Sequence, residues 1–414
     1  MPGASKAGEE NNPDAGAGFC ARKIEMPRPR SILVQTGTGR QRSAVLSSIL
    51  RSEALLLVAL FAGILGYLAE HSLLEGGQVM ALGGAVLLVG AIVLASMRVA
   101  HHAELLAARV GDPYGTMILT SSAVLVEVII LAILMSKDVS PTLVRDTIYS
   151  AVMIDINGIL GLAALLGGLK HGEQSYNDDS SRSYSVMILT AMGISMVVPE
   201  FIPAAKWHFY SAFTIIAMVT LYAVFLRMQV GAHSYFFSYT YPRAVPKTDA
   251  PPASSKPAPG SIAEPVLGSI IILIIGVIII GVLAEVMSVL LTAGLKGTGA
   301  PPVLAAIVVA AISASPEIMT ALRAALANRM QAVVNIALGA SLSTVILTVP
   351  VMEAIALYTG QPFVMAMTPV QTVMVAITLI VAAINLNDGE TNAIEGMTHF
   401  VLFATFIMLS MLGL

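Results

Sequence analysis

Hydrophobic residues occur in this chain as long runs separated by short polar segments. A helix needs roughly 20 apolar residues to cross the hydrocarbon core of a membrane, because each residue adds about 1.5 Å. Eleven runs have about this length, so the pattern predicts an all-α polytopic membrane protein with about eleven transmembrane helices. The predicted helices are 53–70, 79–97, 114–136, 145–168, 184–203, 208–228, 266–292, 301–323, 331–357, 365–386 and 397–414.

The basic residues between these runs predict an orientation. Segments on the cytoplasmic side of a membrane protein carry an excess of Lys and Arg. If the N-terminus is cytoplasmic, 18 of the 22 Lys and Arg residues fall on that side, and those outside are Lys137, Arg145, Lys206 and Lys296. We therefore expect the N-terminus in the cytoplasm and the C-terminus outside.

Two polar stretches divide the chain. Residues 1–43 are rich in Gly, Pro, Ala and charge, which predicts a disordered cytoplasmic tail. Residues 229–264 are rich in Pro, Ser and Ala, which predicts a flexible cytoplasmic linker. The rest forms a leading transmembrane helix (44–75), a first group of five helices (76–228) and a second group of five (265–414). Because an odd number of helices reverses direction, we expect two inverted repeats with a binding site near the midplane.

Composition excludes several classes of protein. The chain is 56% hydrophobic and 11% charged, whereas a soluble domain carries roughly 25% charged residues. Its net charge of −3 gives no reason to expect a nucleic-acid partner, so the predicted surroundings are membrane lipid. The single cysteine, Cys20, excludes an internal disulfide and a thiolate metal site. Walker, HExxH, GxGD and GxSxG-type catalytic motifs were not found, so we expect a transporter without a cofactor rather than an enzyme.

Two glutamates within apolar runs carry the functional prediction. Glu127 is the single charge in 114–136 and lies about 18 Å along that helix, near the middle of the bilayer. Glu317 lies inside 301–323, the second helix of the second repeat, as Glu127 lies in the second helix of the first. An intramembrane carboxylate costs several kcal/mol unless it is protonated or paired, so a functional role is the default interpretation. We predict that the two residues meet and bind a metal cation and protons alternately.

Other oxygen-bearing side chains within or near the apolar runs are candidate auxiliary ligands or pathway residues. They are Ser313, Ser315, Asn157, Asp155, Thr120, Asn335, Ser341, Ser343, Glu104 and Glu285. Most serines and threonines in membrane helices bond only their own backbone, so that alternative stays open for each. Pro316 is expected to break or kink its helix and free backbone carbonyls. Glu353, toward the outer end of 331–357, is expected at a wet interface.

The donor set limits the transported ion. All candidate ligands are hard oxygens, which favour Ca²⁺ or an alkali cation over zinc or copper. Without a cation, burial in hydrocarbon favours the protonated form of a carboxyl group. An arriving cation would displace these protons, which couples cation export to proton entry. Mainly Na⁺(K⁺)/H⁺ exchange is the first alternative, and a cation channel, whose pore acidic groups can also line, is a more distant one.

Several motifs resemble a known family. The run His102-Ala-Glu104 and the sequence GDPYGTMILT with Glu127 resemble the first repeat of bacterial calcium/sodium–proton antiporters of the ChaA type, within the calcium/cation antiporter superfamily. Residues 315–350 resemble the second repeat. The resemblance implies an inverted-repeat antiporter of the bacterial cytoplasmic membrane that exports Ca²⁺, or Na⁺ or K⁺, in exchange for H⁺. It also implies that Glu127 and Glu317 are the ion-binding repeat glutamates.

The motifs also depart from that family. The wider superfamily often has Gly-Asn before these glutamates, where this chain has Leu125-Val126 and Ser315-Pro316. The ion preference of relatives therefore does not transfer. Whether the chain acts alone or as a homo-oligomer stays open.

Overall fold

The computed structural model describes residues 53–110, 114–136, 140–231, 234–237, 239, 266–361 and 363–414. The predicted tail at 1–43 lies outside these residues. The predicted linker lies largely outside them as well, from 240 to 264.

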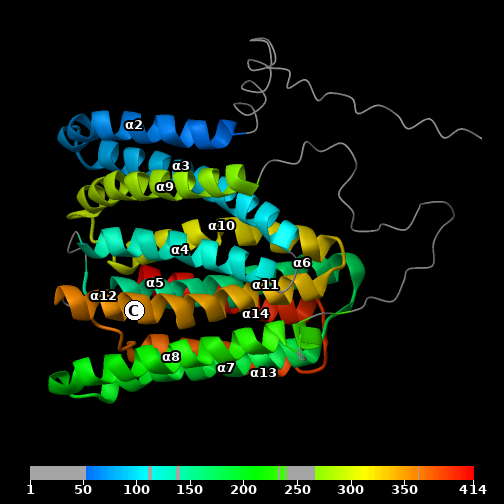
Figure 1. Ribbon diagram of the computed structural model, residues 1–414. Coiled ribbons are helices and arrows are strands. Elements are labelled where there is room, and N and C mark those ends of the chain that lie inside the picture. Colours follow the sequence, from blue (N-terminus) through cyan, green and yellow to red (C-terminus); the bar gives the residue numbers. More distant parts are fainter. Residues whose placement is uncertain are drawn as a thin grey trace, which may run out of the picture. The chain divides into compact units, whose positions relative to one another are not determined.

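Long apolar helices make up most of the described chain (Figure 1). Nine helical segments of this part are long and apolar enough to cross a membrane, and Ser121–Ser136 and Pro369–Asn385 are two shorter apolar helices. This confirms the predicted all-α membrane protein with about eleven spans. The α-helices are α2 (Ala54–Glu75), α3 (Gln78–Val110), α4 (Tyr114–Ser136), α5 (Leu143–Val152), α6 (Gly161–His171), α7 (Asp178–Met192), α8 (Trp207–Val230), α9 (Val266–Leu295), α10 (Val303–Leu326), α11 (Met330–Ser343), α12 (Val349–Thr359), α13 (Pro369–Asn385) and α14 (Ala393–Met411).

Short segments of other helical types join or extend these helices. The π-helical η1 (Met153–Leu160) joins α5 to α6, and the π-helical η6 (Thr344–Thr348) joins α11 to α12. In a π-helix the backbone bond runs from i to i+5, so side chains beyond it turn to a different face. The remaining segments are η2 (Gly193–Val197), which is π-helical, and η3 (Val198–Phe201), η4 (Ala204–Lys206) and η5 (Ser234–Phe237), which are 3₁₀.

The helix α7 begins at Asp178, earlier than its predicted start at residue 184. The side chain of Asn177 accepts a hydrogen bond from the backbone N–H of Asp179 and caps the helix. The negative charges of Asp178 and Asp179 in the first turn then interact favourably with the positive end of the helix dipole. This first turn is polar, so the hydrophobic pattern gave no sign of it.

The predicted break at Pro316 is wrong, because α10 runs without interruption from Val303 to Leu326, whereas the alternative of a kink stays a prediction. Proline has no N–H, so the carbonyl of Ile312 loses its usual helix partner. The hydroxyl of Ser315 donates to that carbonyl at 2.7 Å. Ser315 therefore replaces the missing bond, and the helix continues.

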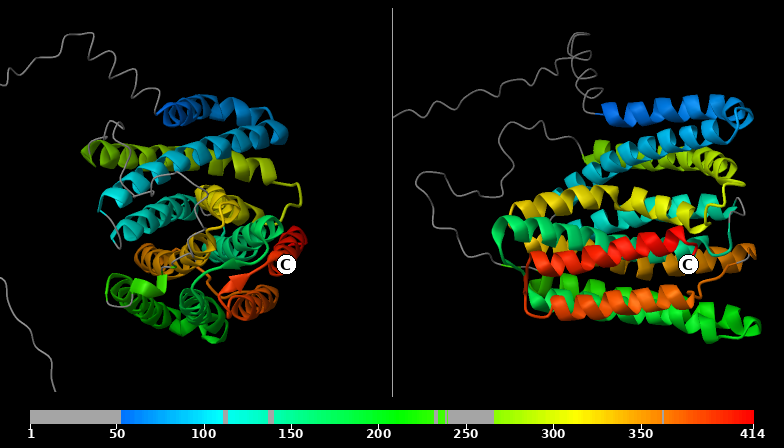
Figure 2. Two further views of the ribbon diagram at one scale, coloured as in Figure 1. Left: turned by 90° about the vertical axis from the view of Figure 1, so that its right-hand side faces the viewer. Right: turned by 180° about the vertical axis from the view of Figure 1, so that it is seen from behind.

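Helices from the two halves of the chain pack against each other. The helix α3 packs along α9, and α10 packs against α5 and α6 (Figures 1 and 2). Glycines permit close approach at such contacts: a Cβ at Gly276 would meet Val99, and one at Gly294 would meet Leu82. Both contacts join α3 to α9, the first helices of the two predicted repeats. The inverted relation between the repeats stays a prediction.

The loops lie at two ends of the helices. Loops 172–177 and 386–392 meet through the strands β1 (Gln174–Ser175) and β2 (Glu390–Thr391), which pair antiparallel. Gln174 also donates to the carbonyl of Ala325, next to the turn 327–329. We call this end the β-pair face. At the opposite face, the N–H of Val364 donates to the carbonyl of Pro141, and Gly413 lies beside Pro301.

A buried ionic cluster joins the start of α2 to α3. The Glu53 carboxylate accepts hydrogen bonds from Nη2 of Arg98 at 2.5 Å and from its Nε at 3.1 Å. Nε2 of His102, whose side chain is fully buried, lies 3.3 Å from the same carboxylate. This cluster fixes the part of α3 that also carries Glu104.

Candidate functional site

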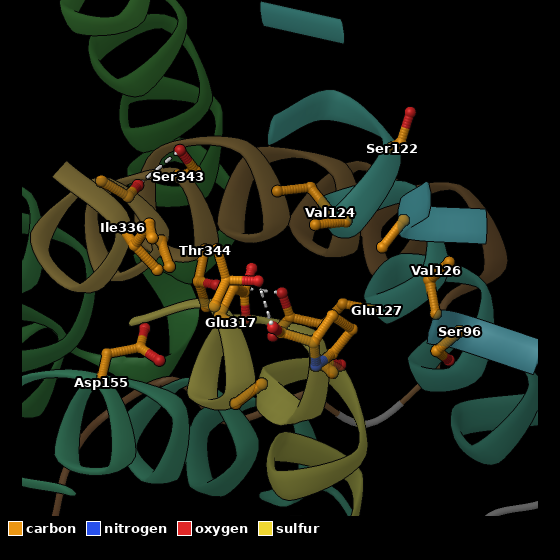
Figure 3. Close-up of a pocket in the computed structure, with 18 of the residues that line it drawn as sticks. Ser96, Ser122, Val124, Val126, Glu127, Asp155, Glu317, Ile336, Ser343 and Thr344 are labelled. Carbon is orange, nitrogen blue, oxygen red and sulfur yellow. Dashed lines mark hydrogen bonds between the residues drawn. The ribbon is translucent and has the colours of Figure 1, made fainter. Parts of the chain in front are cut away.

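A cavity of about 330 Å³ lies among α3, α4, η1, α10 and α11 (Figure 3). Both glutamates singled out in the sequence line it, although they belong to different halves of the chain. The polar residues of its wall are Ser96, Glu104, Ser122, Glu127, Asp155, Ser313, Glu317, Thr320, Asn335, Ser343 and Thr344. The rest of the wall is apolar, as expected for a site inside a membrane protein.

Glu127 is held by the second half of the chain. Its side chain is buried on α4, and its Oε2 accepts hydrogen bonds from the hydroxyls of Thr344 at 3.1 Å and Thr348 at 3.3 Å. Both threonines belong to η6, whose π-helical geometry directs them at one carboxylate. The other oxygen, Oε1, has no hydrogen-bond partner among the described residues.

Glu317 has a different environment. It follows Pro316 on α10, is half-buried and faces the cavity. In Figure 3 its carboxyl group and that of Glu127 point toward each other, and the two are close enough to interact electrostatically. Unlike Glu127, Glu317 receives no hydrogen bond from a described residue that would fix its orientation.

Asp155 is a third carboxyl group in the wall of the cavity. It lies on η1, is buried, and accepts a hydrogen bond from the hydroxyl of Ser341 at 3.1 Å. It interacts electrostatically with Glu317 and Glu127. Ser341 does not line the cavity itself, so its role there is to hold Asp155.

Four other sequence candidates also line the cavity: Glu104, Ser313, Asn335 and Ser343. The two serines bond their own helices, Ser313 to the carbonyl of Val309 and Ser343 to that of Gly339. Asn335 donates to the carbonyl of Phe237 and accepts from Gln331. Glu104 is exposed. Ser313, Ser343 and Asn335 therefore shape the cavity and its polarity more than they offer free ligand oxygens.

Besides Ser341, three candidates do not line the cavity: Asn157, Ser315 and Glu285. Ser315 bonds the Ile312 carbonyl, and Glu285 is exposed on α9. The side chain of Thr120 lies outside the described residues. Sequence position alone did not separate these residues from the wall of the cavity, because it does not give the face on which each one lies.

Asn157 anchors η1 to the last two helices. Its Nδ2 donates to the hydroxyl of Thr378 on α13 at 2.8 Å. Its Oδ1 lies 3.0 Å from Nδ1 of His399 on α14, and both side chains are buried. This network fixes the segment that carries Asp155, so Asn157 supports the site from behind.

Thr344 and Thr348, the two donors to Glu127, were not among the site residues predicted from the sequence. A signal was present, because two threonines four residues apart in an apolar run lie on one face of a helix. Their target could not be predicted from that spacing.

The expected wet position of Glu353 is wrong. Its side chain is 2% exposed, because α8 covers this face of α12. The hydroxyl of Ser211 on α8 donates to its Oε1 at 3.3 Å.

The carboxyl groups do not form a complete metal shell by themselves. Within the described ranges, no group of three or more His, Cys, Asp or Glu side chains is close enough to hold a metal ion. Ca²⁺ takes about 6–8 oxygen ligands. Glu127, Glu317 and Asp155 could supply carboxylate oxygens to a transported cation, and the threonine hydroxyls of η6 could add to them.

Comparison with known proteins identifies the family. The profile of the family described as "Sodium/calcium exchanger protein" matches residues 80–231 and 268–412. The chain belongs to this family. The second matched segment falls within the predicted five-helix group 265–414, and the first overlaps the predicted group 76–228 and ends three residues beyond it.

Two sequence relatives of this chain are named as cation antiporters. It is 34% identical over 320 residues to the sodium-potassium/proton antiporter ChaA of Escherichia coli (strain K12), a match that covers 77% of this chain and 86% of that protein. It is 25% identical over 289 residues to the Ca²⁺/H⁺ antiporter ChaA of Bacillus subtilis (strain 168), covering 68% and 78%. The predicted resemblance to bacterial antiporters of the ChaA type is thereby confirmed.

A solved structure supports the fold of this family member. The structure of the selenium-substituted Ca²⁺/H⁺ antiporter protein YfkE matches with a TM-score of 0.64 and 16% identity, covering 87% of this chain and 98% of that one. The family profile and the 34% identical relative, not this structural match, show that the chain is a multi-pass membrane protein of a bacterial cation antiporter family.

Proposed function

We propose that this protein is a secondary antiporter that exports Ca²⁺ from the bacterial cytoplasm in exchange for H⁺. Glu127 and Glu317 bind the cation and the protons alternately. The observation that carries the proposal is that these two glutamates, from different halves of the chain, point toward each other across one cavity (Figure 3).

The coupling follows from burial and charge. Negative charges on Glu127, Glu317 and Asp155 would repel one another in a cavity whose wall is otherwise mainly apolar. They are stable there only when protons or a cation neutralise them. Competition between the two for the same oxygens makes each transport step depend on the other ion, without ATP.

The charge of the site favours a divalent cation. Glu127, Glu317 and Asp155 together carry enough negative charge to balance Ca²⁺, and Ca²⁺ prefers carboxylate, hydroxyl and carbonyl oxygens. Asp155 and the hydroxyls of Thr344 and Thr348 add oxygens around the pair. These features support Ca²⁺ as the exported ion.

The exposed residues of the cavity wall support access from the cytoplasm. Glu104 and Thr320 are exposed and lie toward the ends of α3 and α10 nearest the β-pair face. The distribution of Lys and Arg predicts that this face is cytoplasmic. The cavity would then admit Ca²⁺ from the cytoplasm of the bacterial cytoplasmic membrane.

A second candidate is mainly Na⁺(K⁺)/H⁺ exchange at the same carboxyl groups. The observation that favours it is the 34% identity to a sodium-potassium/proton antiporter. A monovalent cation would require fewer of the three carboxylates to be charged at once.

A transport assay tests both candidates. The purified protein is placed in liposomes with a pH-sensitive dye, and proton release is followed after Ca²⁺, Na⁺ or K⁺ is added at pH values from 7 to 9. Saturable proton release with Ca²⁺ alone supports the proposal, and release with Na⁺ or K⁺ supports the second candidate. Ion flux without proton movement would refute antiport and favour a channel.

A further inference from the structure

A second buried carboxyl group lies between the central cavity and the opposite face of the membrane. Glu353 is 2% exposed on α12, six residues before the end of that helix at Thr359. The chain after Thr359 enters the loop 360–368 of the opposite face. Glu353 is therefore about 9 Å from that end along the helix axis, whereas Glu104 and Thr320 line the cavity toward the β-pair face.

The hydrogen bonding of Glu353 is incomplete. Ser211 on α8 donates to its Oε1 at 3.3 Å. Its Oε2 is buried and has no hydrogen-bond partner among the residues that the structure describes. Buried polar atoms are nearly always paired, so an unpaired carboxyl oxygen requires an explanation, such as a bound proton or water. A carboxyl group that carries a proton satisfies this need without a counter-charge.

The surrounding helices supply no balancing positive charge in the described part of the chain. Glu353 makes no ion pair there. On α8 the titratable neighbour is Tyr210, whose hydroxyl donates to the carbonyl of Ile194 at 2.7 Å. The helix α4 also contacts α12, and the titratable side chain described on it is Glu127, while η6 contributes only hydroxyls. A permanent negative charge at Glu353 would therefore be costly.

The same helical segment connects Glu353 to the central site. Thr348, which donates to Glu127, lies five residues before Glu353, or about 7.5 Å along the axis. Glu127 and Glu353 each have one buried oxygen without a partner in the described residues. Two such carboxyl groups therefore flank η6, one at the central site and one nearer the opposite face.

We propose that Glu353 binds transported protons on the side of the membrane opposite the β-pair face and exchanges them with Glu127 past Thr348. A proton from the opposite side converts the Glu353 carboxylate to the neutral acid. Its transfer to the Glu127 carboxylate restores the Glu353 carboxylate and leaves Glu127 neutral, so one proton has moved and no other charge has changed. The inference rests on the proposed proton-coupled antiport.

The experiment separates proton transfer from cation binding. Wild type and E353Q are placed in liposomes, and two reactions are measured: Ca²⁺ uptake driven by a pH gradient, and exchange of ⁴⁵Ca²⁺ for Ca²⁺ at equal pH. Gln keeps an oxygen that accepts from Ser211 but carries no exchangeable acid proton. We expect E353Q to lose more than about tenfold of the gradient-driven rate, while isotope exchange stays within about twofold of wild type.

Matched variants control for structural effects. S211A removes the hydrogen bond but keeps the acid, and should keep gradient-driven uptake within about threefold of wild type. If E353Q does not accumulate in the membrane, E353D and E353N give the same comparison, because they share a length and differ in the ability to carry a proton. E353D should then keep gradient-driven uptake, and E353N should lose it.

Three results bear on different claims. Gradient-driven uptake that is unchanged in E353Q, or a parallel loss of both reactions, overturns the role of Glu353. E127Q should lose both reactions in every case. If the wild-type protein catalyses neither reaction with Ca²⁺, Na⁺ or K⁺, the proposed antiport itself is contradicted. That outcome differs from failure of the Glu353 proposal, in which the wild type is active.

Discussion

Glu127 and Glu317 occupy corresponding places in the sequence but unlike environments in the fold. Glu127 is 2% exposed and accepts two threonine hydrogen bonds from η6. Glu317 is half-buried, faces the cavity, and receives no hydrogen bond from a described residue. One carboxylate is oriented before an ion arrives, and the other is free to turn.

This difference suggests a division of work between the halves. A carboxylate that is already oriented loses little entropy on binding a cation, whereas a free one can follow the ion as the cavity closes. We expect Glu317 to receive the cation first and Glu127 to complete the site. The predictions below test this asymmetry, beginning with the largest effect.

Removal of either carboxylate should abolish transport. E127Q and E317Q keep the side-chain size but cannot neutralise a cation or release a proton, so each should reduce proton-coupled Ca²⁺ transport by more than about 100-fold, roughly 2.7 kcal/mol. Dye-loaded liposomes give the measurement. E285Q is the matched control, because Glu285 is exposed on α9 and does not line the cavity; a comparable loss in E285Q would contradict the assignment.

Loss of the threonine donors should affect the site through Glu127 alone. Val has nearly the shape of Thr without its hydroxyl, so T344V with T348V removes both bonds to Oε2 and little packing. Hydrogen bonds to a charged group contribute about 1.5–3 kcal/mol each, so the KM for Ca²⁺ should rise at least about tenfold. S343A is the control, because that hydroxyl bonds Gly339 on its own helix. An unchanged KM in the double variant would show that Glu127 does not need to be oriented.

Removal of the third carboxylate should change ion preference more than activity. D155N removes one negative charge beside Glu317 and Glu127. A divalent cation loses about twice the Coulomb energy that a monovalent one loses, so the preference for Ca²⁺ over Na⁺ should fall several-fold. Competition of the two ions in the liposome assay measures this ratio. S341A, which removes only the hydrogen bond to Asp155, should shift the ratio less, and an equal loss for both ions would contradict a role in selection.

The smallest effect should appear in stability rather than transport. S315A leaves the carbonyl of Ile312 without the hydroxyl that replaces its missing helix bond. The expected loss is about 1 kcal/mol of unfolding free energy, with transport near wild type. In the P316A background the backbone N–H returns, so S315A should then reduce the unfolding free energy much less. Thermal melting of the detergent-solubilised wild type, S315A, P316A and the double variant measures this coupling. Equal costs in both backgrounds would refute the compensation.

The sequence predicted the parts of this protein that depend on local composition. Hydropathy selects the segments that leave water, so the spans followed from runs of apolar residues, and the alternation of loops between two faces followed from their number. Glu127 and Glu317 stood out because a charge within such a run is costly. These inferences required no knowledge of which helices touch.

Tertiary structure decided which faces meet. The π-helical segment η6 turned Thr344 and Thr348 onto Glu127, and helix packing turned Asn157 toward His399 and away from the cavity. Burial of Glu353 depended on α8, a distant segment of the chain. Hydropathy is a property of each segment, whereas the partner of a side chain depends on the rotation of its helix and on the neighbour packed there, and the local sequence does not contain that information.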